Sequence, residues 1–167
     1  SGATPLAFMK TNPDAIAKID LGAAFLGRIP GTIGEVSKLC VLIGAAYLII
    51  RKVISPKIPL IYIGTVAVFT LLFGGHGFDL YYLACELCAG GLIFGAFFMA
   101  TDYVTSPITP LGQIIFAVML GILTGLFRLF GGSAEGVSYA IIICNILVPM
   151  INVHTVPKAF GKEGAKK

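Results

Sequence analysis

Charge is the property that this sequence has least of. Only 12% of its 167 residues are Asp, Glu, Lys or Arg, whereas a soluble globular domain carries about 25%. So little charge cannot coat a surface that faces water, which excludes an ordinary water-soluble domain. Much of the positive charge lies in the C-terminal tail instead of forming a groove-reading patch, which argues against a nucleic-acid-binding protein.

Cysteine is also scarce and gives little information about redox compartment. The four residues Cys40, Cys85, Cys88 and Cys144 lie in or beside apolar stretches, where cysteine usually packs as a small hydrophobe. The C-x-x-C pair formed by Cys85 and Cys88 could hold a metal or an iron–sulfur cluster only if cysteines from other segments converged on it. We therefore expect packing cysteines and no metal site.

The first residues show none of the features of a signal peptide. They contain no initiator Met, no basic segment and no long apolar stretch. We therefore expect Ser1 to be an internal position of a longer protein.

Apolar residues dominate what is present. They make up 57% of the chain, which has 21 Gly and a mean hydropathy of +0.94, as in closely packed membrane helices. Five apolar runs follow one another: Val36–Ile54, Ile58–Gly74, Tyr81–Ala100, Gln113–Phe130 and Val137–Val153. Each has roughly 17–20 residues, the length that an α-helix needs to cross a bilayer. The sequence therefore predicts an all-α, polytopic membrane protein with five transmembrane helices.

The flanking segments set the expected topology. Residues 36–153 form the predicted membrane domain, between a mixed segment 1–35 outside the bilayer core and a basic tail 154–167. With five crossings, the loop 51–57 and the tail share one side, and together they hold Arg51, Lys52, Lys57, Lys158, Lys162, Lys166 and Lys167. The other side holds Lys10, Lys18, Arg28, Lys38 and Arg128. The imbalance predicts a cytoplasmic tail and an outward-facing segment 1–35.

Two polar loops interrupt the apolar pattern. Residues 30–37 and 101–107 combine helix-breaking residues, a carboxylate and hydroxyls, as expected either of a binding site at a broken helix or of ordinary interfacial turns. Asp102 is the stronger candidate for an ion or proton path, with Thr105 and Ser106 as hydroxyl partners, provided that it lies inside the membrane. Glu86 is a weaker candidate of the same kind.

Four short motifs, in order along the chain, resemble those of the NqrB/RnfD family. They are Ser1-Gly2-Ala3-Thr4, the segment Gly31–Ser37 (G-T-I-G-E-V-S), the segment Gly95–Thr105 (G-A-F-F-M-A-T-D-Y-V-T), and Phe130–Val137 followed by Asn145 and Pro149. Tyr103 stands where that family commonly has Pro. The sequence Thr105-Ser106-Pro107 and the short basic tail resemble the RnfD branch more than the NqrB branch.

The resemblance implies a covalent flavin. In this family the Thr of an S-G-A-T sequence carries FMN through a phosphoester bond, which assigns the attachment to Thr4. Helix starts at Gly34, Glu35 and Ser37 could offer N–H groups to the flavin, although a carboxylate at a helix start is also simply stabilising. The pair Gly90-Gly91 would let a flat ring approach closely, or else another helix. A second flavin, riboflavin, is an expectation for elsewhere in the subunit.

The implied function is electron transfer coupled to ion transport. The resemblance points to a membrane subunit of a Rnf-type ferredoxin:NAD oxidoreductase that moves Na⁺ or H⁺ across a bacterial or archaeal plasma membrane. Its partners would be membrane and peripheral subunits carrying flavin and iron–sulfur groups. The implied fold has two related five-helix halves similar to urea channels, with this chain as the second half. A channel or transporter subunit without a redox group is the alternative that composition alone leaves open.

Overall fold

A computed structural model describes residues 21–28, 36–75, 79–88, 90–131 and 136–157. The regular structure of these ranges is helical, which confirms the all-α prediction. In chain order the elements are α2 (Leu21–Leu26), α3 (Lys38–Ile50), α4 (Lys57–Phe73), α5 (Leu80–Cys88), α6 (Leu92–Phe94), the π-helical segment η2 (Gly95–Met99), α7 (Pro110–Leu129) and α8 (Val137–Thr155).

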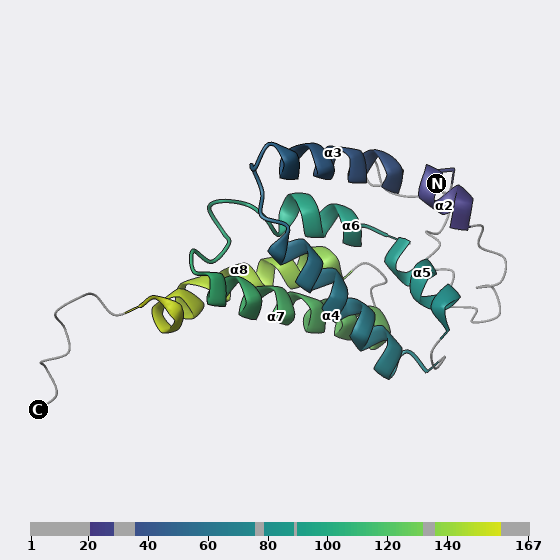
Figure 1. The fold of residues 1–167 in the computed structure, drawn as a ribbon. Helices are drawn as coiled ribbons and strands as arrows, with labels where there is room; N and C mark the ends of the chain where they lie inside the picture. Colours follow the sequence, from purple (N-terminus) through teal and green to yellow (C-terminus); the bar gives the residue numbers. More distant parts are fainter. Residues whose placement is uncertain (1–20, 29–35, 76–78, 89, 132–135, 158–167) are drawn as a thin grey trace, which may run out of the picture.

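Successive helical segments alternate in direction (Figure 1). The helices α3, α4, α7 and α8 fall on four of the predicted apolar runs, and α5, α6 and η2 together fall on the fifth. Contacts are most extensive between α4 and α7, α8 packs along α7, and α3 packs against α6. The C-terminal ends of α3 and α8 lie at the same end of the molecule (Figure 1), as the predicted topology requires of the loop 51–57 and the tail.

Helix length limits how many complete crossings the described residues show. With 20 and 19 residues, α7 and α8 are long and apolar enough to span a membrane. The α5 and α6–η2 pair makes a third candidate if the two bent parts form one span. The apolar helices α3 and α4 are shorter, with 13 and 17 residues. Two or three candidate spans are therefore present, and the full count of five stays a prediction.

The third predicted span is not one continuous helix. The run Tyr81–Ala100 is interrupted after Cys88, and its two parts meet at 65°. Gly90 has a φ of +74°, a left-handed conformation that ends a regular α-helix and suits glycine. Beyond the break the backbone widens into a π-helical turn, in which the N–H of Ala100 donates to the Gly95 carbonyl at 2.8 Å. Hydropathy alone did not predict this interruption, because it does not register local backbone conformation.

Glycine also brings α4 and α7 into close contact. A Cβ added to Gly121 would lie 2.4 Å from the Cβ of Thr65, and one added to Gly125 would lie 2.3 Å from the Phe69 ring. The spacing G-x-x-x-G on α7 places both glycines on one face, as in many membrane helix pairs. Between them Thr124 shares a buried 2.6 Å hydrogen bond with the Tyr62 hydroxyl of α4.

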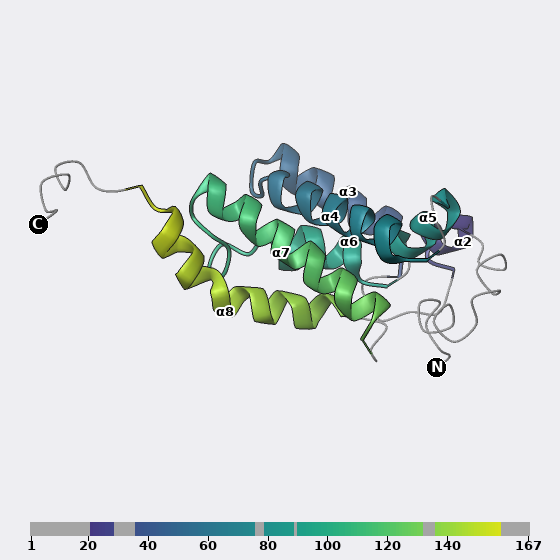
Figure 2. The same cartoon turned by 90° about the horizontal axis from the view of Figure 1, so that it is seen from below.

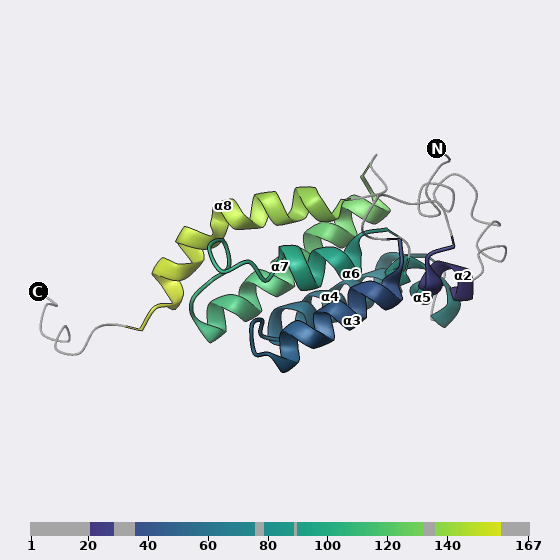
Figure 3. The ribbon, with the colours of Figure 1, turned by 90° about the horizontal axis from the view of Figure 1, so that it is seen from above.

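The outer faces of the bundle are apolar, as expected of surfaces in contact with lipid. Exposed large apolar side chains include Ile43, Tyr47 and Ile50 of α3, Leu60, Val68 and Leu72 of α4, Leu111 and Ile114 of α7, and Ile142, Ile146 and Met150 of α8. The helix α8 bends in its C-terminal part (Figures 2 and 3). Pro149 lies inside this helix and accounts for the bend, since proline removes one backbone hydrogen bond and clashes with the preceding turn.

Candidate functional site: buried charges at the break between α5 and α6

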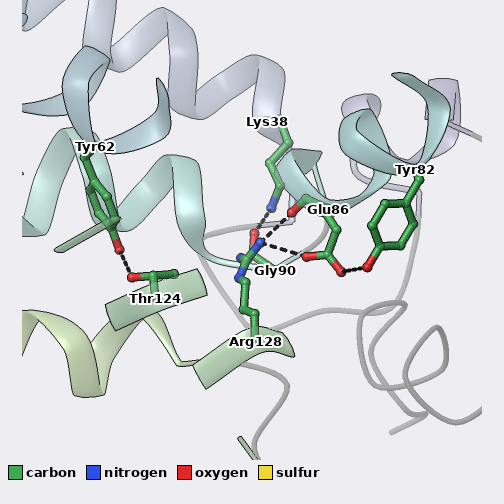
Figure 4. A network of polar contacts seen from close by, with 7 residues as sticks. All are labelled: Lys38, Tyr62, Tyr82, Glu86, Gly90, Thr124 and Arg128. Carbon is green, nitrogen blue, oxygen red and sulfur yellow. Dashed lines mark hydrogen bonds and ion pairs between the residues drawn. The ribbon is translucent and has the colours of Figure 1, made fainter. Parts of the chain in front are cut away.

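Three charged side chains meet inside the bundle where α5 ends (Figure 4). Lys38 comes from the first turn of α3, Glu86 from the last turn of α5 and Arg128 from the last turn of α7. Their exposed fractions are only 3%, 7% and 5%. Charges removed from water are costly unless they are paired and hydrogen-bonded, so the contacts among these groups decide whether the arrangement is stable.

Arg128 binds both the side chain and the backbone of Glu86. Its Nη1 lies 3.3 Å from Oε2 of the carboxylate and donates to the Glu86 carbonyl oxygen at 2.5 Å. The Tyr82 hydroxyl, one turn earlier on α5, donates to Oε1 of the same carboxylate at 3.5 Å. The guanidinium thus neutralises the acid and also satisfies a carbonyl group near the end of α5.

Lys38 reaches the other side of the break. Its Nζ donates to the Gly90 carbonyl oxygen at 2.7 Å. Carbonyl groups at a helix C-terminus lack intrahelical partners and carry the negative end of the helix dipole. Two cations from separate helices therefore donate to carbonyl oxygens on the two sides of the break.

The start of α3 positions Lys38. Ser37 is the N-cap residue, and its hydroxyl accepts a 3.4 Å hydrogen bond from the backbone N–H of Cys40. Gly27, which follows α2 with a φ of +87°, packs so closely that a Cβ there would lie 2.9 Å from Ser37. Ser37 was predicted to bind flavin, and what the structure shows is its capping bond.

Asp102 lies apart from this cluster, beyond the other end of the α6–η2 segment. It is exposed, and its Oδ2 accepts a 3.1 Å hydrogen bond from the Thr105 hydroxyl. The backbone N–H of Ser106 donates to the Asp102 carbonyl at 3.2 Å. The Tyr103 hydroxyl donates to the Val53 carbonyl and so joins this loop to the connection between α3 and α4.

Other predicted site residues divide into two groups. Thr4, Gly34 and Glu35 lie outside the described residues. Gly90 and Gly91 form the break itself, where the Gly90 carbonyl faces Lys38, and close approach of a flavin ring to this pair stays a prediction.

Sequence reasoning missed Lys38 and Arg128, which entered only as flanking charges that set orientation. Their partners are 52 and 42 residues away in the chain, so no local pattern pairs them. One signal was present. Glu86 lies inside one apolar run and Arg128 at the end of another, and opposite charges in such segments are expected to pair.

Two of the cysteines are buried. Cys144 of α8 belongs to the main core cluster, and Cys85 of α5 is 1% exposed. Both are free thiols. Within the ranges that the structure describes, no group of three or more His, Cys, Asp or Glu is arranged to hold a metal ion.

Several known proteins similar to this chain are D subunits of ion-translocating oxidoreductase complexes. The chain is 42% identical over 167 residues to the D subunit of the Na⁺-translocating ferredoxin:NAD⁺ oxidoreductase complex of Acetobacterium woodii, across 99% of this chain and 50% of that protein. It is 49% identical over 140 residues to the proton-translocating counterpart of Clostridium ljungdahlii, across 83% of this chain and 42% of that protein. The D subunit of the ion-translocating oxidoreductase complex of Stutzerimonas stutzeri is 37% identical over 180 residues, covering the whole chain and 50% of that protein.

The matched lengths show how much of each relative and of a family profile this chain covers. The chain spans about half the length of the curated relatives it matches. The sequence profile of the NQR2, RnfD, RnfE family matches residues 1–161, nearly all of this chain. Together with the identities to these relatives, this match shows that the chain belongs to the NQR2, RnfD, RnfE family.

Proposed function

We propose that the full-length protein is the D subunit of an ion-translocating ferredoxin:NAD⁺ oxidoreductase complex. The observation that carries the proposal is the family match over residues 1–161, joined to 37–49% identity with D subunits of such complexes. The complex would couple electron transfer to Na⁺ or H⁺ movement, with other membrane and peripheral subunits supplying further flavin and iron–sulfur groups. Two of the relatives are described as translocating different ions, so either ion fits this chain.

The membrane arrangement that we infer has five crossings. The alternating directions of α3, α4, the α5–α6–η2 segment, α7 and α8 support it (Figure 1). In this arrangement the tail after α8 is cytoplasmic and Thr4 lies on the outer side. A urea-channel-like pair of five-helix halves is part of the same proposal, with this chain as one half.

We infer that Thr4 carries FMN through a phosphoester bond. The sequence Ser1-Gly2-Ala3-Thr4 supports this assignment, because it resembles the S-G-A-T motif in which the Thr of this family carries FMN. Bound FMN supplies the capacity to accept and release electrons. Gly34, Glu35, Ser37, Gly90 and Gly91 are the proposed flavin environment, and riboflavin is a proposed second flavin elsewhere in the subunit.

A buried polar centre in the described half supports an ion-coupled role over a purely structural one. Ionisable groups within membrane segments are rare and usually functional, and Lys38, Glu86 and Arg128 meet between three different helices. Asp102, with Thr105 and Ser106, is proposed as a second polar position on the ion path if it lies at membrane depth. For Asp102→Asn we expect lower coupled transport with assembly and flavin content retained.

Mass spectrometry of the Thr4 peptide from the purified complex tests the flavin assignment. The peptide should carry the mass of FMN less water, and the denatured subunit should fluoresce in a gel. Thr4→Ala should abolish that fluorescence, whereas the matched control Thr11→Ala should keep it. An unmodified Thr4 peptide from active complex would refute the assignment and favour a channel subunit without a redox group.

A further inference from the structure

The connection from α3 to α4 gathers three exposed cations. Arg51 and Lys52 follow the last residue of α3, Lys57 begins α4, and all three residues are exposed. Within the ranges that the structure describes, none of the three forms an ion pair with a carboxylate. By contrast, Lys38 and Arg128 are buried and donate to carbonyl oxygens. The connection therefore presents outward positive charge that no described carboxylate neutralises.

An apolar stripe on α3 leads to these cations. Leu39, Ile43 and Tyr47 recur every fourth residue, so they lie along one face of the helix, and Arg51 continues the series as the C-cap residue. Ile43 and Tyr47 are 62% and 63% exposed. From Leu39 to Arg51 the distance is about 18 Å, close to half of the roughly 30 Å hydrocarbon thickness of a bilayer. This α3 stripe thus has about the length of one leaflet, with a cation at its end.

We propose that this surface binds one anionic phospholipid, with the headgroup phosphate at Arg51, Lys52 and Lys57 and an acyl chain along the α3 stripe. Guanidinium and ammonium groups are the side chains that bind phosphate, and an acyl chain covers exposed apolar surface. Tyr47, one turn before Arg51, has the amphipathic ring that is typical of the membrane–water boundary. The α3 helix lies along one side of the bundle, with the connection to α4 at one of its ends (Figure 1).

The backbone at Lys52 supports a role for its charge. Its φ is +56°, a left-handed conformation that residues other than glycine rarely adopt. The N–H groups of Lys52 and Val53 donate to the carbonyls of Ile49 and Leu48 at 2.9 Å each, the pattern of a Schellman helix end, at which glycine is preferred. Lysine is the less favourable residue for this backbone but supplies a cation beside Arg51. The variant Lys52→Gly can therefore separate backbone stability from charge.

This inference does not depend on the flavin or on ion transport. It requires only that the connection between α3 and α4 lies at a membrane surface, and it holds for either orientation of the chain. Each Lys or Arg near a membrane surface strengthens attraction to anionic lipid by about fivefold. The three cations together should therefore produce a clear preference for an anionic over a zwitterionic phospholipid.

The experiment uses the purified full-length complex in nanodiscs of phosphatidylcholine. A small fraction of the lipid is replaced by phosphatidylglycerol or phosphatidylcholine that carries a photoactivatable diazirine in its acyl chain, and the label on peptides containing Ile43 and Tyr47 is measured after illumination. In the unaltered complex, phosphatidylglycerol should label these peptides at least tenfold more than phosphatidylcholine does. Equal labelling by the two lipids would overturn the proposal.

The variant Arg51→Gln/Lys52→Gln/Lys57→Gln should bring this ratio close to one. Labelling by phosphatidylcholine should persist in it, which shows that the α3 stripe still faces lipid. Lys52→Gly should lower the ratio about fivefold, although the complex should unfold at the same or a higher temperature. Arg28→Gln is the matched control, because Arg28 is an exposed cation that follows α2. An unchanged ratio in Lys52→Gly, or the same loss in Arg28→Gln, would contradict the proposal.

Inorganic phosphate distinguishes a lipid headgroup from a soluble anion. Replacing chloride by excess phosphate at equal ionic strength should leave the labelling ratio unchanged, because free phosphate has no acyl chain to lie along the α3 stripe. Loss of the preference for phosphatidylglycerol in phosphate would identify a site for the free anion and would overturn the proposal.

Discussion

Two interfaces of this protein hold helices together by opposite means. Between α4 and α7, glycines let the backbones approach until Gly121 faces Thr65 with no room for a Cβ. At the break between α5 and α6, the helices instead contribute full charges, which satisfy one another and the carbonyl groups of an interrupted helix. The first interface gains its stability from close packing, and the second avoids the penalty of unpaired buried groups. The first interface should therefore lose stability when a methyl group is added, and the second when a charged group is removed.

The largest effect is expected at the charged interface. Arg128→Met would leave the Glu86 carboxylate buried without its cation and should lower the free energy of unfolding by about 3–5 kcal/mol. Adding Glu86→Gln to that variant should restore part of the loss, since the orphaned charge is then gone. Unfolding in mixed micelles by titration with SDS measures both changes, and an additive double variant would show that the two side chains do not interact.

The glycine interface should respond to added volume. Gly121→Ala places a methyl group against the Thr65 side chain and should destabilise the protein by roughly 1–3 kcal/mol. Gly64→Ala on α4 is the matched control, because a Cβ there meets nothing within 4 Å. Alanine has the higher helix propensity, so this control should be neutral or slightly stabilising. Equal losses in the two variants would show that the close approach of Gly121 to Thr65 is not the cause of the change.

An effect no larger than this is expected from the hydrogen bond that crosses the packed interface. Thr124→Val keeps the shape of the side chain but removes the partner of the buried Tyr62 hydroxyl. The loss should be about 1–3 kcal/mol, the usual penalty for a buried hydroxyl left unsatisfied. Tyr62→Phe combined with Thr124→Val should recover part of it, and a double variant less stable than either single one would contradict this account.

The smallest change should follow loss of the α3 cap. Ser37→Ala removes the hydroxyl that accepts from the Cys40 N–H and should cost about 0.5–2 kcal/mol. Ser37→Asp preserves the cap and should retain stability. The same pair of variants separates capping from flavin binding, because a flavin contact would change the flavin potential in Ser37→Ala beyond any change in stability.

Sequence alone predicted the helical class and the positions of the helices, because apolar runs of bilayer length have few other solutions. It did not predict the interruption at Gly90, where glycine fits either a packed helix or a left-handed turn. Whether Gly90 adopts the helix or the turn depends on tertiary contacts. Lys38 and Arg128 supply such contacts at the break, and these form only when α3 and α7 pack beside α5. The residues of the candidate site lie far apart along the chain, so no local sequence pattern indicated that they meet. Its acidic member, Glu86, was visible as a charge in an apolar run.

The helix α7 serves both interfaces with one face. Seven residues separate Gly121 from Arg128, which is nearly two full turns, or about 10 Å along the axis. The glycine that meets α4 and the arginine that holds α5 therefore project in nearly the same direction from one rigid rod. Any sliding or rotation of α7 against α4 must carry the guanidinium with it by the same amount. A change in the register between α7 and α4 would therefore also move Arg128 relative to the Glu86 carboxylate of α5.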